Sequence, residues 1–185
     1  MIEKEIMGWH VIFAGFKNVE TSNIDALLER VRREASGCQV QIFDAKMIAG
    51  LDHLYFAVLN ALKAMESGNK ISSSLAMEIL LYASGQHQID KAIRMLGVKE
   101  GSSQIVVVVL SESREKSMEA MLKISRVIGG EPCDEVINLT DEKFSIIKSK
   151  FEISDAELEA TLRRSKEEAL TSILIERSAL LVTQI

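Results

Sequence analysis

Proline, cysteine and histidine are scarce in this chain of 185 residues, and the low number of each limits which structures and functions are possible. A single proline leaves few forced interruptions, so long regular helices and strands are expected. Two cysteines, Cys38 and Cys133, are too few for a disulfide-dense scaffold and do not show metal-site spacing. The reducing cytoplasm is therefore the expected compartment.

The three histidines are too few and too far apart in the sequence for most metal sites and for most histidine-assisted nucleophiles. None lies at ligand spacing from another histidine, a cysteine or a paired carboxylate, and a zinc site needs three or four convergent ligands. No dinucleotide, lipase-type or metalloprotease motif is present, and Gly129-Gly130 is followed by Glu131-Pro132 rather than the Lys-Ser/Thr pair of a phosphate loop. We therefore expect no catalytic residues, no metal, no cofactor and no enzyme activity.

Charge and hydropathy narrow the possible partners. Apolar residues make up 47% of the chain and charged residues 26%, as in ordinary globular proteins. No apolar run is long enough for a membrane span, and no cleavable leader is expected at the start. The net charge of −5 argues against a broad grip on duplex nucleic acid, but it leaves room for a local contact with a single strand.

Hydrophobic periodicity predicts mixed helices and strands without strict alternation. The fold class is therefore α/β (α+β), a single domain over residues 1–185 with a small mixed sheet flanked by helices on both faces. Residues before Met7 show too little periodicity for an assignment. The predicted strands cover residues 9–16, 40–43, 105–110 at the centre of the sheet and 135–139 at an edge, and the predicted helices cover residues 24–35, 51–67, 75–83, 89–96, 118–128, a short stretch after Thr140, and a long stretch from the Ser154–Glu157 capping box almost to the end.

The stretch from Ser72 to Gly97 is predicted to form two short helices, each closed by a glycine. The first has a buried stripe through Leu75, Ile79 and Tyr82, and Gly85 follows where a left-handed residue ends a helix. The second has a stripe formed by Ile89, Ala92, Ile93 and Leu96. Between the two helices only a short polar tip remains.

Two polar residues, His53 before this stretch and Glu78 within it, each allow two interpretations. His53, near the start of a largely apolar helix, is either a satisfied structural histidine or a ligand-contacting one. Glu78 lies off the apolar stripe of its helix, so a solvated position is expected, and the alternative is a buried acid poised for proton transfer.

The same stretch carries a family resemblance. Glu78 to Gly85, then Gln88-Ile89, Ala92-Ile93 and Gly97, resemble the central motif of the small regulatory subunit of the KEOPS complex, the PRPK-binding protein family. Further matches follow the family's order along the chain: Val40 to Ala45, Gly50 to His53, and a final helix with Glu176 to Leu181. The chain differs at Gln86 and His87, where the family usually has basic residues, so a contact at this tip cannot depend on a fixed positive charge.

The resemblance implies a non-catalytic binding subunit. Such a subunit binds the small kinase/ATPase of KEOPS and the 3′ CCA end of tRNA, and it supports threonylcarbamoyladenosine (t6A) modification, whose catalytic chemistry belongs to other chains. The candidate tRNA-binding residues are His53, Gly85, Gln86, His87, Gln88 and Lys91.

The candidate kinase-docking surface lies on the last helix. Its apolar face widens towards the end with Leu170, Leu174 and Leu181, which exceeds what one side of a sheet absorbs. The competing hypothesis is a small stand-alone enzyme or small-molecule-binding protein with a cleft near His53 and Glu78. A pocket of converging polar groups with a shifted acid would favour this alternative.

Overall fold

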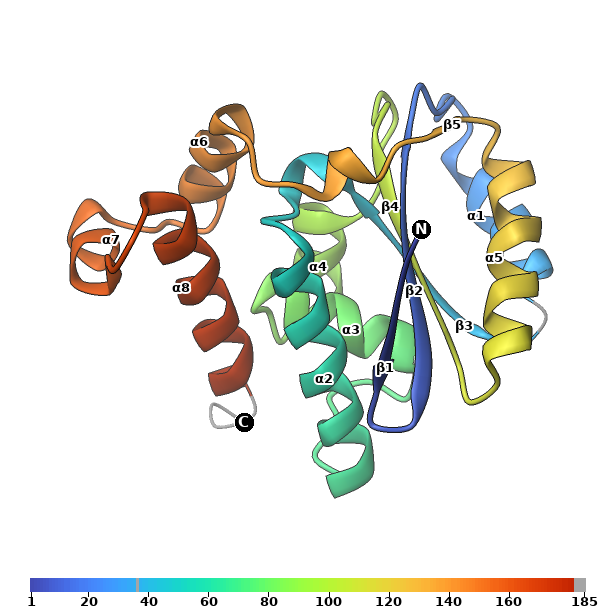
Figure 1. Ribbon diagram of the computed structural model, residues 1–185, viewed down its shortest axis with the longest axis horizontal. Helices are drawn as coiled ribbons and strands as arrows, with labels where there is room; N and C mark the ends of the chain where they lie inside the picture. The colour runs from blue at the N-terminus through green and yellow to red at the C-terminus, as the bar shows by residue number, and fades with distance from the viewer. Residues whose placement is uncertain (36, 182–185) are drawn as a thin grey trace. The chain divides into compact units, whose positions relative to one another are not determined.

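The computed structural model describes residues 1–35 and 37–181, and Figure 1 shows its helices and strands. Contacts within the chain group these residues into two compact units. The first unit combines residues 1–45 and 97–136, and the second combines residues 46–96 with those from 137 onward. The single domain of the sequence analysis therefore stays a prediction, whereas the α+β class is confirmed.

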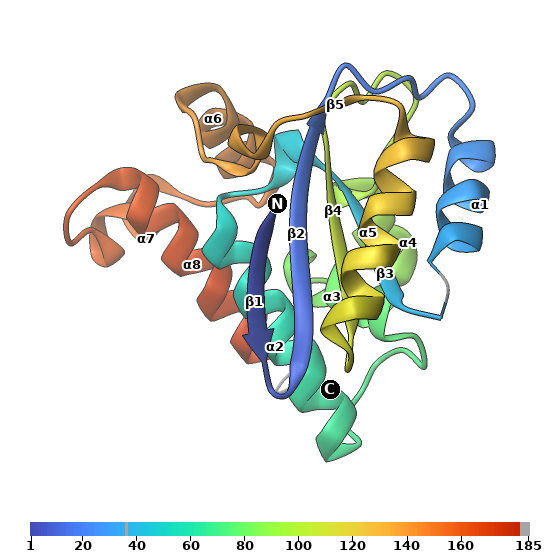
Figure 2. The same ribbon diagram turned by 45° about the vertical axis from the view of Figure 1, so that its right-hand side comes forward.

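The first unit contains the sheet, whose strand order is β1-β2-β4-β3, with β5 paired to β2. Figure 2 shows β1, β2 and β4 in succession across it. Every pairing is antiparallel, so the predicted mixed sheet is wrong in this respect. The strands are β1 (Ile2–Ile6), β2 (Trp9–Lys17), β3 (Gln39–Asp44), β4 (Ile105–Ser111) and β5 (Glu131–Pro132).

Strand β4 confirms the central position predicted from its unbroken apolar run. It lies between β2 and β3, and Ile105 to Leu110 are buried. Strand β1, in contrast, escaped the sequence analysis. It joins β2 through a two-residue turn in which Met7 and Gly8 both have positive φ, 52° and 79°, and such turns suit the twist of a hairpin.

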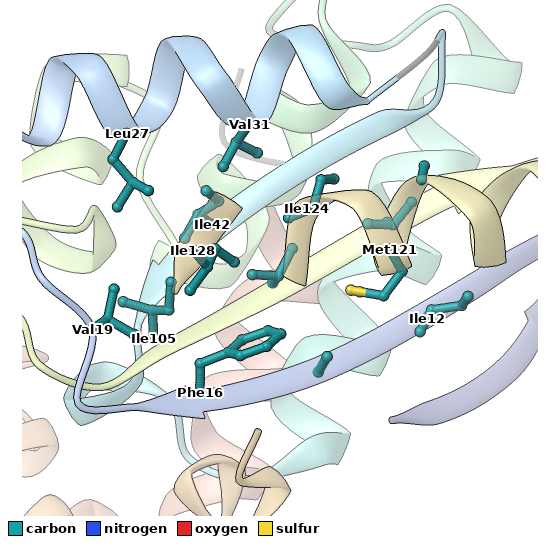
Figure 3. Close-up of a cluster of buried hydrophobic side chains, with 14 residues drawn as sticks. Ile12, Phe16, Val19, Leu27, Val31, Ile42, Ile105, Met121, Ile124 and Ile128 are labelled. Carbon is teal, nitrogen blue, oxygen red and sulfur yellow. The ribbon is translucent and has the colours of Figure 1, made fainter. Parts of the chain in front are cut away.

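Two helices of the first unit pack on the same side of this sheet. They are α1 (Ile24–Glu34), capped by Asn23, and α5 (Arg114–Ile128), capped by Ser113. Their buried side chains meet inward-pointing residues of the strands in one apolar cluster, as Figure 3 shows. The cluster includes Ile12, Phe16, Leu27, Val31, Ile42, Ile105, Met121 and Ile124.

The second unit contains the remaining α-helices. They are α2 (Leu51–Ser67), α3 (Leu75–Ser84), α4 (Ile89–Leu96), α6 (Asp141–Lys150), α7 (Asp155–Thr161) and α8 (Lys166–Leu180). The predicted limits of α2 are confirmed, and the predicted glycine end of α3 is Gly85 in the left-handed conformation. A short 3₁₀ turn, η1 (Ala45–Met47), precedes α2. Within the described residues no helix combines the length and apolar character that crossing a bilayer requires.

Two predictions near the C-terminal third are wrong. The expected edge strand over residues 135–139 is instead the 3₁₀ turn η2 (Asp134–Ile137), and residues 136 and 137 are buried without strand pairing. The expected single final helix is divided, because Ser165 begins α8 by accepting a hydrogen bond from the Glu168 amide. The capping box of Ser154 and Glu157 is present, but it begins only the short helix α7.

Candidate functional site

The tip of the α3–α4 hairpin is formed by Gly85 to Gln88. The left-handed conformation of Gly85, at φ 61°, lets the chain turn while its amide donates to the Tyr82 carbonyl at 3.2 Å. Gln86 is half-buried, and its amide donates to the Leu81 carbonyl at 3.1 Å. Gln88 is exposed, and so is Lys91 one turn further on. The structure thus gathers five of the six predicted tRNA-binding residues, Gly85, Gln86, His87, Gln88 and Lys91, on one short segment.

His87 stands out among these residues because one of its ring nitrogens lacks a partner. The side chain is half-buried, yet Nε2 is shielded from solvent and makes no hydrogen bond to any described residue. A shielded polar atom without a partner costs free energy that an incoming ligand can recover. His87 therefore has hydrogen-bonding capacity that the described residues leave unused.

Helix α4 adds exposed apolar surface beside the tip. Ile89 is 40% exposed and Ile93 is 44% exposed, and their i,i+4 spacing places them on one face of the helix. Their periodicity in the sequence predicts that both lie on the buried stripe. The structure shows that only Ala92 and Leu96 of that stripe are fully buried.

His53 lies beneath the hairpin and not on its surface. It is 1% exposed, its Nδ1 accepts a hydrogen bond from the Ala49 amide at 3.2 Å, and its Nε2 lies 2.8 Å from the Ala83 carbonyl in the last turn of α3. Burial, with the nearby positive charge of Lys143, lowers the pKa of His53 to about 4, so the ring is neutral at neutral pH with its proton on Nε2. Of its two open interpretations, the structure favours the structural histidine.

Two further side chains brace the same end of α3. The Phe151 ring packs edge-on against the His53 ring, with centroids 6.2 Å apart. The guanidinium of Arg177 in α8 donates to the Phe151 carbonyl at 2.5 Å and to the Glu157 carboxylate at 2.7 Å. A Cβ built on Gly85 would lie 3.9 Å from Arg177 Cβ, so α8 runs alongside the tip. No local pattern in the sequence predicts this role of Arg177, because Phe151 and Glu157 are distant from it in the chain.

The Glu157 carboxylate also serves the capping box of α7. It accepts a hydrogen bond from the Ser154 amide at 2.8 Å, and this bond together with Arg177 lowers the pKa of Glu157 to about 2. The carboxylate is therefore ionised throughout the neutral range. Its role is to hold α7 against Arg177, and nothing in this arrangement provides an acid for catalysis.

Glu78 is buried, so the predicted solvated position is wrong. It is 0% exposed, and its two carboxylate oxygens accept hydrogen bonds from the amides of Ile71 at 3.0 Å and Ser72 at 2.7 Å. Periodicity predicts a solvated Glu78 because the residue lies off the Leu75–Tyr82 stripe. In the structure nearly all of α3 is buried, including the flank outside this stripe. The carboxylate is fully used in holding the loop before α3.

The structure places the three predicted kinase-docking leucines inside the second unit. Leu170, Leu174 and Leu181 are 0%, 2% and 1% exposed on the face of α8 that turns towards the interior. The opposite face of α8 is open to solvent, with Glu176 and Ala179 exposed and Leu180 45% exposed. The three leucines are therefore not accessible to a partner of the folded chain.

Metal-ligating side chains do not converge in the described ranges 1–35 and 37–181. No group of three histidine, cysteine, aspartate or glutamate side chains in these ranges could hold a metal ion. Burial raises the pKa of the Cys38 thiol, which makes it a poorer nucleophile.

The hairpin tip combines polar groups with exposed apolar side chains, and the polar side chains beneath it are already hydrogen-bonded within the chain. This arrangement is typical of a binding protein. The comparison with known families agrees, because the chain belongs to the kinase binding protein CGI-121 family, whose model matches residues 16–181. It is also similar to the regulatory protein Cgi121 of Methanocaldococcus jannaschii, with 35% identity over 117 residues, 63% of this chain and 72% of that protein. Membership in this family of binding proteins confirms the prediction of a non-catalytic protein.

Proposed function

We propose that this chain is the small regulatory subunit of a KEOPS complex. In this role it binds the small kinase/ATPase subunit and the 3′ CCA end of tRNA, and it supports t6A modification catalysed by another chain. The family match over residues 16–181 carries the kinase part of the proposal. The exposed polar and apolar groups of the hairpin tip support the RNA part.

The kinase is proposed to dock on the outward face of α8. This face ends with Ala179 and the exposed side chain of Leu180, and Ile175 lies half-buried one turn before them. Apolar anchors at the centre of an interface often contribute about 2 kcal/mol or more each. This assignment replaces Leu170, Leu174 and Leu181, which the folded chain keeps in its interior.

The kinase test uses two leucines that are almost equally exposed. Leu180, 45% exposed on α8, and Leu122, 46% exposed on α5, are each changed to glutamate, and complex formation with the small KEOPS kinase is measured by calorimetry and size-exclusion chromatography. We expect Leu180→Glu to weaken binding by about 30-fold, equivalent to roughly 2 kcal/mol, with little change in Leu122→Glu. Equal binding of both variants and the wild type would move the interface away from α8, and absence of any wild-type complex would refute kinase binding itself.

The RNA is proposed to contact the tip through unpaired nucleotides. A chain of net charge −5 cannot hold the body of a tRNA by neutralising phosphates, but single-stranded bases can stack and be read along their edges. Gln86, His87 and Gln88 offer hydrogen-bonding groups and a ring, and Lys91 can reach a phosphate. His53, being buried, acts in this proposal by positioning the end of α3 through the Ala83 carbonyl.

The RNA test compares intact tRNA with tRNA lacking CCA at several salt concentrations. We expect binding to depend on the CCA end and to fall with salt less steeply than in a basic RNA-binding domain. His87→Ala and Gln88→Ala should weaken binding, whereas Gln104→Ala, at an exposed glutamine of the first unit, should not. Equal binding of the truncated tRNA would refute the proposed mode of contact.

The geometry disfavours the alternative of a stand-alone enzyme with a cleft near His53 and Glu78. Both side chains are buried, and each is engaged by backbone groups of its own unit. Neither has the exposure that a substrate contact needs.

A further inference from the structure

A cavity lined by both polar and apolar groups lies where α2, α3 and α8 come together in the second unit. Its volume is about 650 Å³, and it opens between the last turns of α2, Tyr82 of α3 and Ala179 of α8. This volume lies within the range of ordinary ligand pockets. Of the residues that line it, only Ala179 has been assigned a role above, at the end of the proposed docking face.

Tyr82 gives the cavity a fixed polar anchor. The residue is 2% exposed, and the surface that it keeps lines the cavity. Its hydroxyl makes no hydrogen bond to the residues that the structure describes. Burial and the nearby charge of Glu78 raise the pKa of Tyr82, so the hydroxyl stays protonated and can donate a hydrogen bond.

The other polar groups of the cavity define what this donor could meet. Lys63 is exposed on the wall formed by α2, and it forms no ion pair within the described ranges. Asn60 donates to the Ser178 hydroxyl at 3.1 Å, which fixes its amide and leaves its carbonyl oxygen as an acceptor. Glu66 lies on the exposed rim, one helical turn beyond Lys63. A hydroxyl donor and an ammonium group together suit an anionic oxygen acceptor.

The position of the cavity points to the kinase as the source of that acceptor. Ala179, which lines the cavity, immediately precedes Leu180 on the outward face of α8. Resting on the proposed function, we propose that the cavity receives an aspartate or glutamate side chain of the kinase, held by the Tyr82 hydroxyl and the Lys63 ammonium. The carboxylate accepts both hydrogen bonds, and the surrounding apolar contact excludes water from them.

Tyr82→Phe tests the anchor with little disturbance of the fold. The substitution keeps the buried ring and removes a hydroxyl that bonds to no described residue, so the unfolding temperature should stay close to that of the wild type. We expect affinity for the small KEOPS kinase to fall about 10-fold, since a hydrogen bond to a charged group is lost. Tyr55→Phe is the matched control, because Tyr55 lies on α2 outside the cavity, and it should bind as the wild type does.

The sign of the charge effect tests the nature of the bound group. We expect Lys63→Gln to weaken binding about fivefold and Glu66→Gln to strengthen it about twofold, because the bound group is an anion. The opposite pair of signs would show a cationic group and overturn the proposal. Wild-type affinity in both Tyr82→Phe and Lys63→Gln would overturn it too.

The experiment separates failure of this inference from failure of the proposed function. A complex that forms with the wild type and weakens in Leu180→Glu, but not in the cavity variants, rejects the cavity alone. A wild-type chain that forms no complex rejects kinase binding and the cavity together.

Discussion

Mild acid is predicted to destabilise the second unit through a single buried side chain, His53. The ring is 1% exposed and neutral, and it joins the Ala49 amide before α2 to the Ala83 carbonyl at the end of α3. Burial lowers its pKa to about 4 from an ordinary value of 6.5. Protonation would place a charge in the interior and turn Nδ1 from an acceptor into a donor facing another donor, the Ala49 amide.

The sign and size of the effect follow from the difference between the folded and unfolded pKa. The unfolded chain binds the proton first as the pH falls, so the stabilisation is complete above pH 6.5 and is lost as the pH approaches 4. With these two pKa values the loss between pH 7 and pH 5 is about 2 kcal/mol, out of a full shift worth roughly 3 kcal/mol. For a protein of this size, about 2 kcal/mol is a substantial part of the total stability.

Urea unfolding at pH 7 and pH 5 measures this loss in the wild type and in His53→Gln. A glutamine amide can donate to the Ala83 carbonyl and accept from the Ala49 amide, but it does not titrate. The wild type should lose about 2 kcal/mol more than His53→Gln between the two pH values, since other acidic groups act equally in both. His10→Gln, at a half-buried position on β2, should keep the wild-type dependence. Equal losses in the wild type and His53→Gln would refute the assignment of this pH dependence to His53.

Three further predictions concern the fold and the absence of chemistry. Glu78→Gln should lower the free energy of unfolding by about 2 kcal/mol and the unfolding temperature by about 4–8 °C, because an amide cannot accept both the Ile71 and Ser72 hydrogen bonds; an unchanged thermal melt would contradict this. Gly15→Ala should cost about 1–3 kcal/mol in urea unfolding, since the added methyl would overlap the Cys133 carbonyl oxygen; wild-type stability would contradict the close approach. The purified chain should release no phosphate from ATP, because its candidate base and acid, His53 and Glu78, are both buried and hydrogen-bonded to backbone groups; turnover that a single substitution abolishes would overturn this.

Local signals in the sequence were sufficient for most helices and for the central strand. The limits of α2 coincide with Gly50 and Gly68, and α3 begins after a serine cap and ends at Gly85. Caps and glycine ends act through backbone groups within a few residues, so a single sequence contains the information that they need. The hairpin of α3 and α4, and with it the candidate site, was predicted for this reason.

Residues whose partners are distant in sequence were harder to interpret. The apolar face of α8 was visible, but its periodicity could not say whether Leu170, Leu174 and Leu181 meet the chain itself or another protein. The structure shows these leucines buried, and the smaller exposed surface at Leu180 remains for a partner. Tyr82 was assigned to a buried stripe, and the cavity beside it became visible only when α2 and α8 were in place.

The errors in the strands have a different cause. Strand β1 has three exposed charged residues between Ile2 and Ile6, so its hydrophobic alternation is lost although its pairing with β2 is regular. Residues 136 and 137 have the composition of a strand, but they are buried in a 3₁₀ turn. That turn is held in part by the Asp134 carboxylate, which accepts a hydrogen bond from the Gly15 amide at 3.0 Å. Burial in the tertiary structure overrides intrinsic strand preference in such short segments.

The contacts of Arg177 decide which variants can separate the two proposed binding activities. Its guanidinium holds the Phe151 carbonyl and the Glu157 carboxylate, and its Cβ lies against Gly85 at the hairpin tip. The same helix presents Leu180 to solvent. A substitution at Arg177 would therefore disturb both the support of the hairpin tip proposed for RNA and the helix proposed for the kinase. Substitutions of interacting residues are not additive, and their effects cannot be assigned to one surface. Leu180 and Gln88 are exposed and make none of the contacts of the Arg177 guanidinium, so each can be changed without removing those contacts. The two proposed binding activities are therefore best separated by substitutions at Leu180 and Gln88 rather than at Arg177.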